Sequence, residues 1–187
     1  MDKLGHEFYP EGTLSQPLSR DPILEAQRNW ERRGWEDVAE PMAAITALMR
    51  TQQILLQRAE TVLKPFGLTF ARYEMLALLS FAREGSLAMN RASALLQVHA
   101  TSVTNAVDRL ESAGLVARTK HPTDKRTTLI ALTRQGRELA AAATIELNSQ
   151  VFADSGFSDR DISTLIRIFS KFRREAGDFS GDEPASE

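Results

Sequence analysis

The sequence contains no cysteine, and this absence removes several kinds of chemistry at once. Without thiols there is no disulfide framework, no thiolate metal site and no cysteine-based peroxide sensor. Histidine is scarce as well, since only His6, His99 and His121 occur and they are far apart in the chain. A protein zinc site needs several such ligands at short, regular spacings. We therefore expect no metal site and no cofactor.

The sequence also lacks the motifs of common enzymes. It has no HExxH pair, no Walker A loop, no GxGxxG and no GxSxG, so we expect no catalytic residues and no enzymatic activity. Long apolar runs are missing too: no stretch of about 18 uncharged apolar residues occurs, and the N-terminus MDKLGHEFYP has no signal-peptide core. These absences favour a cytoplasmic protein that does not contact a membrane.

The charge of the chain is unevenly distributed. Its 187 residues, 42% hydrophobic and 26% charged, suffice for one domain with a hydrophobic core and an extension. The formal net charge of −2 does not by itself favour a nucleic-acid partner. Residues 105–137, however, hold seven cations and three carboxylates, a net charge of +4 that leaves −6 for the remainder. A cationic segment in an acidic chain is typical of a surface that meets phosphates.

Residues 89–132 predict the unit around which the chain is organised. Two short helical patterns, at residues 90–96 and from about His99 to Gly114, are separated by a four-residue gap. Two β-type runs follow at residues 115–120 and 127–132, joined by the turn HPTDKR. A pair of helices followed by a charged hairpin is typical of a helix-turn-helix with a wing.

The second helix would bury Val103, Val107 and Leu110 and turn short polar side chains outward. Hydroxyl and amide groups on such a face can approach base edges in a major groove about 12 Å wide. At the hairpin tip, Asp124 can pair with Arg126, while the cations reach a phosphate or a minor groove. Solvated polar surface remains an alternative explanation for both features. The predicted DNA-binding residues are Arg91, Thr101, Ser102, Thr104, Asn105, Arg109, Lys120, Lys125 and Arg126, with Asp124 stabilising the wing.

The N-terminal part of the chain predicts an arm and an extra helix. Residues 1–20 contain several glycines and prolines and are expected to be flexible. Asp21-Pro22 is typical of a helix start, which predicts a short extra helix within residues 21–34. Trp30 and Trp35, the only tryptophans, belong to this region. They either dock the helix onto the rest of the protein or form the wall of a ligand pocket.

The predicted fold class is mainly α with a small β-hairpin: a winged helix-turn-helix DNA-binding unit flanked by N- and C-terminal dimerisation helices. The main domain would span residues 35–176, with the winged unit at about 68–132. A helix opened by Pro41, at residues 41–63, has an apolar face wider than one packing partner needs, and two more amphipathic helices lie within residues 134–176. The acidic tail, residues 177–187, is expected to be disordered.

The segment GLVARTKHPTDKRTTLIALTRQGREL, residues 114–139, resembles the signature of the multiple antibiotic resistance regulator (MarR) family. The D-x-R wing turn of that signature is Asp124-Lys125-Arg126, and its LT-x-x-G is Leu132, Thr133 and Gly136. The upstream VHATSVTNAVDRLESAGL resembles the recognition helix of the family, and the resemblance covers roughly residues 41–176. It implies a homodimer that binds double-stranded DNA at a pseudo-palindromic operator. The alternative from another class is a winged-helix protein-interaction module without DNA binding.

The resemblance further implies a repressor that is released by a small phenolic or anionic effector. The residues carried over for that site are Arg50, Arg72, Tyr73 and Arg118, with Trp30 or Trp35 as an aromatic wall. The extra N-terminal helix is similar to that of the urate-responsive subgroup. Two departures count against urate, because the aspartate and the recognition-helix arginine of that subgroup fall on Glu74 and Ala106. An effector of another kind is therefore expected.

Overall fold

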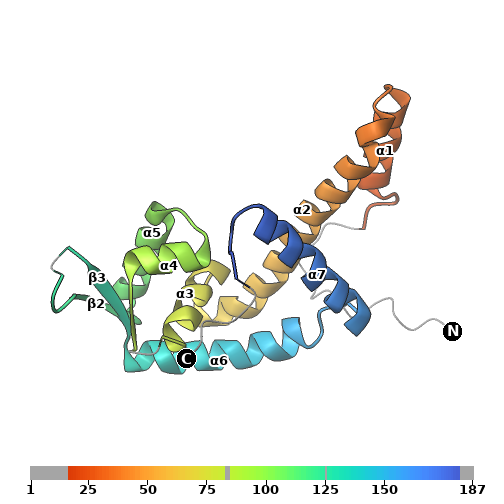
Figure 1. Cartoon of the computed structure of the whole chain (residues 1–187). Coiled ribbons are helices and arrows are strands. Elements are labelled where there is room, and N and C mark those ends of the chain that lie inside the picture. The colour runs from red at the N-terminus through yellow and green to blue at the C-terminus, as the bar shows by residue number, and fades with distance from the viewer. Residues whose placement is uncertain (1–16, 83–84, 125, 182–187) are drawn as a thin grey trace. The chain divides into compact units, whose positions relative to one another are not determined.

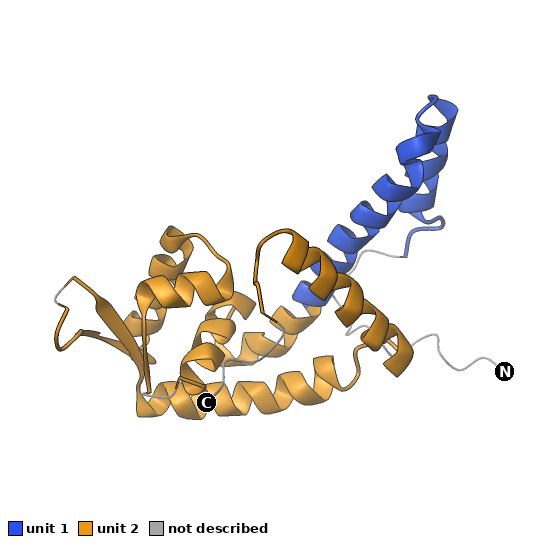
Figure 2. Cartoon of the chain, in the orientation of Figure 1, with its two compact units in different colours: residues 1–57 blue, residues 58–187 orange. Residues whose placement is uncertain are grey.

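The protein is described by a computed structural model that covers residues 17–82, 85–124 and 126–181. The chain forms two compact units, residues 1–57 and 58–187 (Figure 2). The described residues are mainly helical and include one small antiparallel sheet (Figure 1), which confirms the predicted fold class. The helices are α1 (Pro22–Arg32), α2 (Glu36–Leu63), α3 (Phe70–Ser80), α4 (Met89–Leu96), α5 (Ala100–Ser112), α6 (Arg134–Leu147) and α7 (Asp159–Glu175), and the strands are β1 (Ser86–Ala88), β2 (Val116–Lys120) and β3 (Thr128–Leu132).

In the first unit, α1 begins where the sequence indicates a helix start. The Asp21 carboxylate accepts the N–H of Ile23 at 2.8 Å, and Pro22 occupies the first turn, where its missing N–H costs nothing. Residues 1–16, most of the predicted arm, lie outside the described residues. The rings of Trp30 and Trp35 pack edge to face with their centroids 5.4 Å apart. The two tryptophans therefore stabilise the connection that leaves α1.

The helix α2 begins at Glu36, five residues before the predicted start at Pro41. The prediction placed proline in the first turn, whereas Pro41 lies inside the helix. A single proline this close to the start removes only one helical hydrogen bond, and the acidic Glu36 and Asp37 favour the N-terminal end of the helix dipole. Local charge therefore outweighs the preference of proline for the first position.

In the second unit, a three-stranded sheet in the order β1-β3-β2 packs with α3, α4 and α5. The strand β1 was not predicted, because three residues are too few to show an alternating pattern. Leu87 of β1 pairs with Ile130 of β3, and Ile130 is fully buried. The predicted apolar side of α5 is confirmed, since Val103 and Leu110 are each 1% exposed. Burial of this side leaves the opposite face of α5 in solvent.

The wing joins α6 through a close contact between backbones. Thr133 is the N-cap of α6: its hydroxyl accepts the N–H of Gly136 at 3.0 Å and donates to the carbonyl of Gly114 at 2.7 Å. A Cβ atom on Gly136 would lie only 1.9 Å from the carbonyl oxygen of Leu115. The Thr-x-x-Gly spacing is therefore set by two needs, a cap at Thr133 and the absence of a side chain at Gly136.

The helix α6 continues into a π-helical segment, η2 (Asn148–Phe152). The helical region therefore ends at Phe152, as the sequence predicts, but its last five residues have π-helical hydrogen bonds. A guanidinium group at the second-unit end of α2 fastens this segment. Arg58 donates to the carbonyl of Gln150 at 2.7 Å and to that of Asp154, and its side chain is only 16% exposed. One carbonyl within η2 and one just after it thereby gain a hydrogen-bond donor.

The last helix, α7, has the capping box that the sequence indicates. The Ser158 hydroxyl and the Asp161 carboxylate each bind the backbone N–H of the other residue. The hydrogen bonds from Ser158 lower the pKa of Asp161. Contrary to the prediction of a disordered tail, Asp178 is held by hydrogen bonds, while residues 182–187 lie outside the described part. Among the described helices, none is both long and apolar enough to cross a bilayer.

We predict that Gly136→Ala lowers the free energy of unfolding by about 2 kcal/mol or more, because the new methyl group must displace the Leu115 backbone. Alanine is the better helix former by about 1 kcal/mol, so helix propensity alone predicts the opposite sign. Urea denaturation measures the difference. Gly181→Ala is the control, because no atom of the described residues, its chain neighbours aside, lies within 4 Å of its Cβ position. Equal stability of the two variants would contradict the packing argument.

Candidate nucleic-acid interface

Local hydrogen bonds shape the turn between α4 and α5. Gln97 ends α4 in the left-handed region, with φ 51°, and the Ser93 hydroxyl donates to the carbonyl of Val98 at 2.7 Å. His99 is the N-cap of α5, where its Nδ1 accepts the N–H of Thr101 at 3.3 Å. The sequence did not reveal this cap, because histidine is not among the preferred N-cap residues. The turn thus defines where the outward face of α5 begins.

The outward face of α5 holds the polar residues that were predicted to contact DNA. Thr104 donates its hydroxyl to the carbonyl of Ala100 at 3.0 Å, so this hydroxyl is already engaged within the helix. The side chains of Asn105 and Arg109 are exposed and form no hydrogen bond or ion pair with any other described residue. They are therefore available to a ligand outside the chain. The exposed positions on this face are Thr101, Ser102, Thr104, Asn105 and Arg109.

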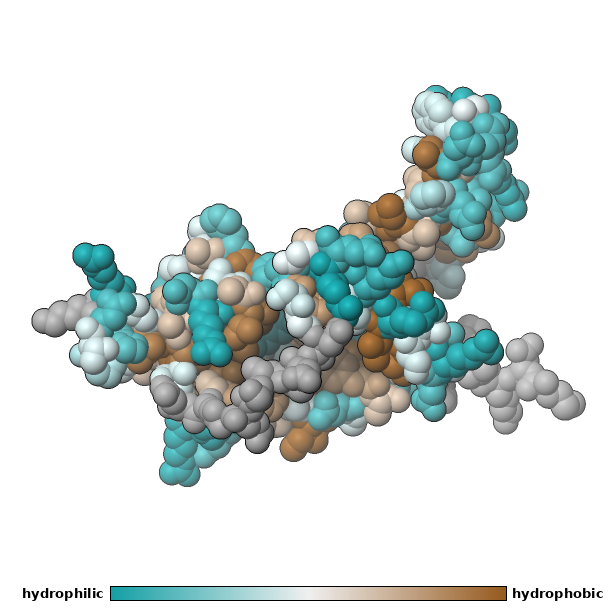
Figure 3. Space-filling view, viewed as in Figure 1, coloured by the Kyte–Doolittle hydropathy of each residue, from teal (hydrophilic) through white to brown (hydrophobic). Residues whose placement is uncertain are grey.

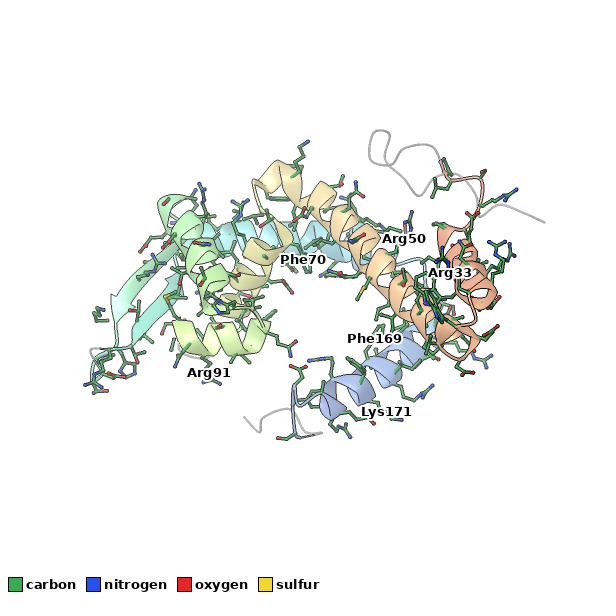
Figure 4. All side chains as sticks on the ribbon, turned by 90° about the horizontal axis from the view of Figure 1, so that it is seen from above. Arg33, Arg50, Phe70, Arg91, Phe169 and Lys171 are labelled. Carbon is green, nitrogen blue, oxygen red and sulfur yellow. The ribbon has the colours of Figure 1, made fainter. Side chains whose placement is uncertain are left out.

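Arg91 and Lys120 extend the polar surface beyond α5. Arg91 lies on α4 with its side chain directed away from the helix (Figure 4), and Lys120 ends β2; both are exposed. Neither side chain has a hydrogen-bond or ion-pair partner among the described residues. The first helix of the pair and the wing strand thus each add one cation to the surface around α5.

Arg118 joins the wing to α5. From β2, its guanidinium donates to Asp108 at 2.5 Å and to Glu111 at 2.5 Å, and its backbone N–H donates to Glu111 at 3.2 Å. Burial acts to lower the pKa of Arg118, but the hydrogen bonds to the two carboxylates outweigh it and raise the pKa above its usual value. The resemblance placed Arg118 among the ligand-binding residues, whereas here its charge neutralises two carboxylates of α5. Removing that neutralisation would leave acidic groups beside the outward face of the helix.

Asp124 organises the wing tip through hydrogen bonds to both side-chain and backbone groups. Its carboxylate accepts the hydroxyl of Thr127 at 2.7 Å and the N–H of Arg126 at 3.0 Å, and these hydrogen bonds lower its pKa, Thr127 contributing most. The N–H of Asp124 in turn donates to Nδ1 of His121 at 3.2 Å. The expected pairing with Arg126 therefore uses its backbone N–H and not its guanidinium. Among the described residues that guanidinium has no ion-pair partner, and Lys125 lies outside the described part.

The residues proposed for an effector site fall in both units. Trp30, Trp35 and Arg50 belong to the first unit, and Arg50 is exposed (Figure 4). In the second unit the Arg72 Nε donates to the hydroxyl of Thr69 at 3.2 Å. Tyr73 is buried.

The environment of Tyr73 links α3 to α6. Its hydroxyl lies 3.0 Å from the hydroxyl of Thr144, and its ring packs against Phe70 with centroids 6.2 Å apart. Next to it, burial raises the pKa of Glu74. No group of three or more metal-ligating side chains occurs within the described ranges.

Comparison with protein families and curated proteins identifies relatives for the central part of the chain. A model of the MarR family matches residues 66–127. The transcriptional regulator PapX of Escherichia coli is 33% identical over 84 residues, which are 45% of this chain and 51% of that protein. The uncharacterised transcriptional regulator YdgJ of Bacillus subtilis is 38% identical over 110 residues, 57% of this chain and 65% of that protein. The chain thus spans between half and two thirds of these two curated relatives.

Solved structures give a longer match. Sco5413 from Streptomyces coelicolor, described as a MarR family transcriptional regulator, is 44% identical, with a TM-score of 0.70 over 76% of this chain and 99% of that one. MepR from Staphylococcus aureus, solved as a DNA complex, is 24% identical, with a TM-score of 0.62 over 70% of this chain and 96% of that one. The second similarity concerns the fold alone, whereas the first extends to the sequence.

Proposed function

The chain belongs to the MarR family of winged-helix transcriptional regulators, and on this basis we propose that it binds double-stranded DNA in a sequence-specific manner to regulate transcription. Membership of a family of regulators agrees with the expectation that the protein is not an enzyme. The observation that carries the proposal is the unpaired Arg126 at the wing tip, beside a recognition helix whose Asn105 and Arg109 are also unpaired among the described residues. Acting on DNA would place the protein in the cytoplasm.

In the proposed complex, α5 enters a major groove and the wing contacts the adjacent backbone or minor groove. Asn105 and Arg109 lie four residues apart, so they share one side of the helix. Amide and guanidinium groups are the side chains that bind adenine and guanine edges in pairs of hydrogen bonds. Arg91, Lys120 and Arg126 would bind phosphates and hold the helix in register. The structure of MepR in complex with DNA supports a DNA-binding role for this fold.

We further propose that the protein is a homodimer. Within the first unit, α2 exposes the apolar residues Ile45, Leu48 and Met49. Within the second unit, α7 exposes Phe169 and Phe172, and Figure 3 shows brown apolar surface beside the hydrophilic side chains of this region. Apolar side chains at this density are usually covered by another surface. A two-fold dimer would read a pseudo-palindrome with half-sites about one helical turn apart.

The finer part of the proposal is a repressor that is released by a small phenolic or anionic compound. The candidates that the family resemblance carries over are Arg50, Arg72, Tyr73 and Arg118, with Trp30 or Trp35 as an aromatic wall. The two tryptophans can also report binding, because the chain has no other tryptophan. We expect a phenolic acid to quench tryptophan emission and to weaken DNA binding over the same concentration range. A titration with a broad panel of such acids that changes neither signal would exclude an effector of this class.

For the dimer, we predict that Phe169→Asp shifts the protein to a monomer at micromolar concentration, because it buries a charge in an apolar interface. Lys171→Asp is the matched control, since Lys171 lies on the opposite side of α7 (Figure 4) and is exposed. Sedimentation velocity measures both. A wild-type monomer, or a dimer that survives Phe169→Asp unchanged, would contradict the assignment of this interface.

For DNA binding, we predict that Arg126→Ala weakens binding and lowers the slope of log K against log salt by about one per site, as expected for a lost phosphate contact. Arg160→Ala removes the same charge from the exposed first turn of α7 and should leave the slope unchanged. Fluorescence anisotropy with DNA from the protein's own promoter region gives both slopes. Equal effects of the two substitutions would exclude a wing contact, and an absence of salt-dependent binding would favour the protein-interaction alternative.

A further inference from the structure

The C-terminal end of α7 forms a built turn. Gly177 adopts φ 78°, and the N–H of Asp178 donates to the carbonyl of Arg173 at 2.9 Å. The chain therefore reverses and brings the Asp178 carboxylate to 2.5 Å from the Arg173 Nε. The ring of Phe179 lies against the same guanidinium, 5.3 Å from its central carbon. These contacts hold a segment that the sequence predicted to be disordered.

The same carboxylate also reaches the helix-turn-helix. Its second oxygen accepts the side-chain N–H of Gln97 at 2.7 Å, a contact between residues 81 positions apart (Figure 1 shows the segment that leaves α7). The side chain of Asp178 is only 13% exposed, although it lies near the end of the described chain. We call the contact set of Arg173, Asp178 and Gln97 the Asp178 bridge. It connects α7 directly to the end of α4.

The backbone of Gln97 is a second, independent observation. Gln97 is the only non-glycine residue with a positive φ in the described part of the chain. This left-handed conformation favours glycine or asparagine, so a glutamine there is held by its surroundings. Its side chain supplies the N–H donor of the bridge, which neither glycine nor alanine could do. Two residues later, His99 caps α5. A restraint on Gln97 is therefore a restraint on the start of the recognition helix.

We propose that the Asp178 bridge is a positioning contact through which α7 fixes the helix-turn-helix for DNA binding. The contacts of the bridge do not depend on the proposed function, but their effect on DNA binding does. With α7 at the dimer interface, the bridge would set where each α5 stands relative to its partner. Loss of the bridge frees the turn between α4 and α5, and a freer turn must be ordered again when DNA binds. Specific binding, which needs both recognition helices in register, then weakens.

Because Asp178 is acidic, the direction in which Asp178→Ala changes DNA affinity distinguishes the bridge from simple electrostatics. Removal of an acidic residue would by simple electrostatics tighten binding to DNA of any sequence. The bridge predicts weaker binding of Asp178→Ala to specific DNA, whereas its binding to non-specific DNA should be unchanged or slightly tighter. We expect Asp178→Ala to weaken specific binding about fivefold or more, the lower end of typical coupling between distant sites. Gln97→Ala, which changes no charge, should have the same effect.

The test is a double-mutant cycle of Asp178→Ala and Gln97→Ala, with Glu175→Gln as the control because Glu175 is an exposed acid whose carboxylate pairs with Lys171. Hydrogen–deuterium exchange of residues 98–104 in the free protein is read first, and anisotropy titrations with operator and with non-specific DNA follow. We expect both single variants to exchange faster and bind operator more weakly, the double variant to match either one, and the control to match wild type. Additive effects, unchanged exchange, or tighter operator binding by Asp178→Ala would overturn the bridge. If wild type binds no DNA, the proposed function fails, while the exchange data still decide whether the bridge holds the turn.

Discussion

The contact between Arg118 and the two carboxylates of α5 fixes the position of the wing relative to α5. The side chain of Arg118 is 23% exposed and those of its partners are more so, and each such surface ion pair by itself adds little to stability, of the order of 0–1 kcal/mol. The contact matters because it fixes the orientation of β2 on α5: one planar guanidinium binds Asp108 and Glu111 at 2.5 Å each, and the backbone N–H of Arg118 adds a third hydrogen bond. With those acids neutralised, the cations of the helix and the wing dominate the surface that they share.

The stability of this arrangement comes mainly from hydrophobic packing in the core under α5 and the sheet. Val107 of α5 and Ile130 of the central strand are fully buried in the same hydrophobic core. At the base of the wing, α6 approaches Leu115 so closely that only glycine fits at position 136. Close-packed contacts of this kind tolerate little displacement. The polar groups on the outside can therefore be held at fixed spacings without contacts among themselves.

How much of this was predictable depends on the range of the interaction. The apolar side of α5, the Thr133 cap and the capping box at Ser158 each rest on residues within a few positions, and the sequence reveals them. The strand β1 pairs with a segment more than forty residues away and is too short for a pattern of its own. The contact of Asp178 with Gln97 was also not predicted, because the two residues are 81 positions apart and no local signal links them. At the wing, the sequence identified Asp124 but not its backbone partners, because turn geometry decides which atoms it meets.

The net charge of the chain also gains a structural explanation. The acidic excess lies outside residues 105–137, whose net charge is +4, so a protein of formal charge −2 still has a cationic segment, which meets DNA in the proposed complex. Within that segment the acids are used internally: Asp108 and Glu111 bind Arg118, and Asp124 binds the wing backbone. The cations that remain unpaired among the described residues are then those that face outward.

In the proposed complex, two copies of the chain bind one duplex, each with its α5 and wing at one of two successive major grooves. Hydroxyl-radical footprinting of the promoter region measures this most directly, because it reports the protected backbone at single-nucleotide resolution. Binding of a two-fold dimer should give paired protected segments on one face of the DNA, with centres about one helical turn apart and flanking protection at the wings. A single protected segment without a symmetric partner, or no protection at concentrations where the protein is dimeric, would contradict it.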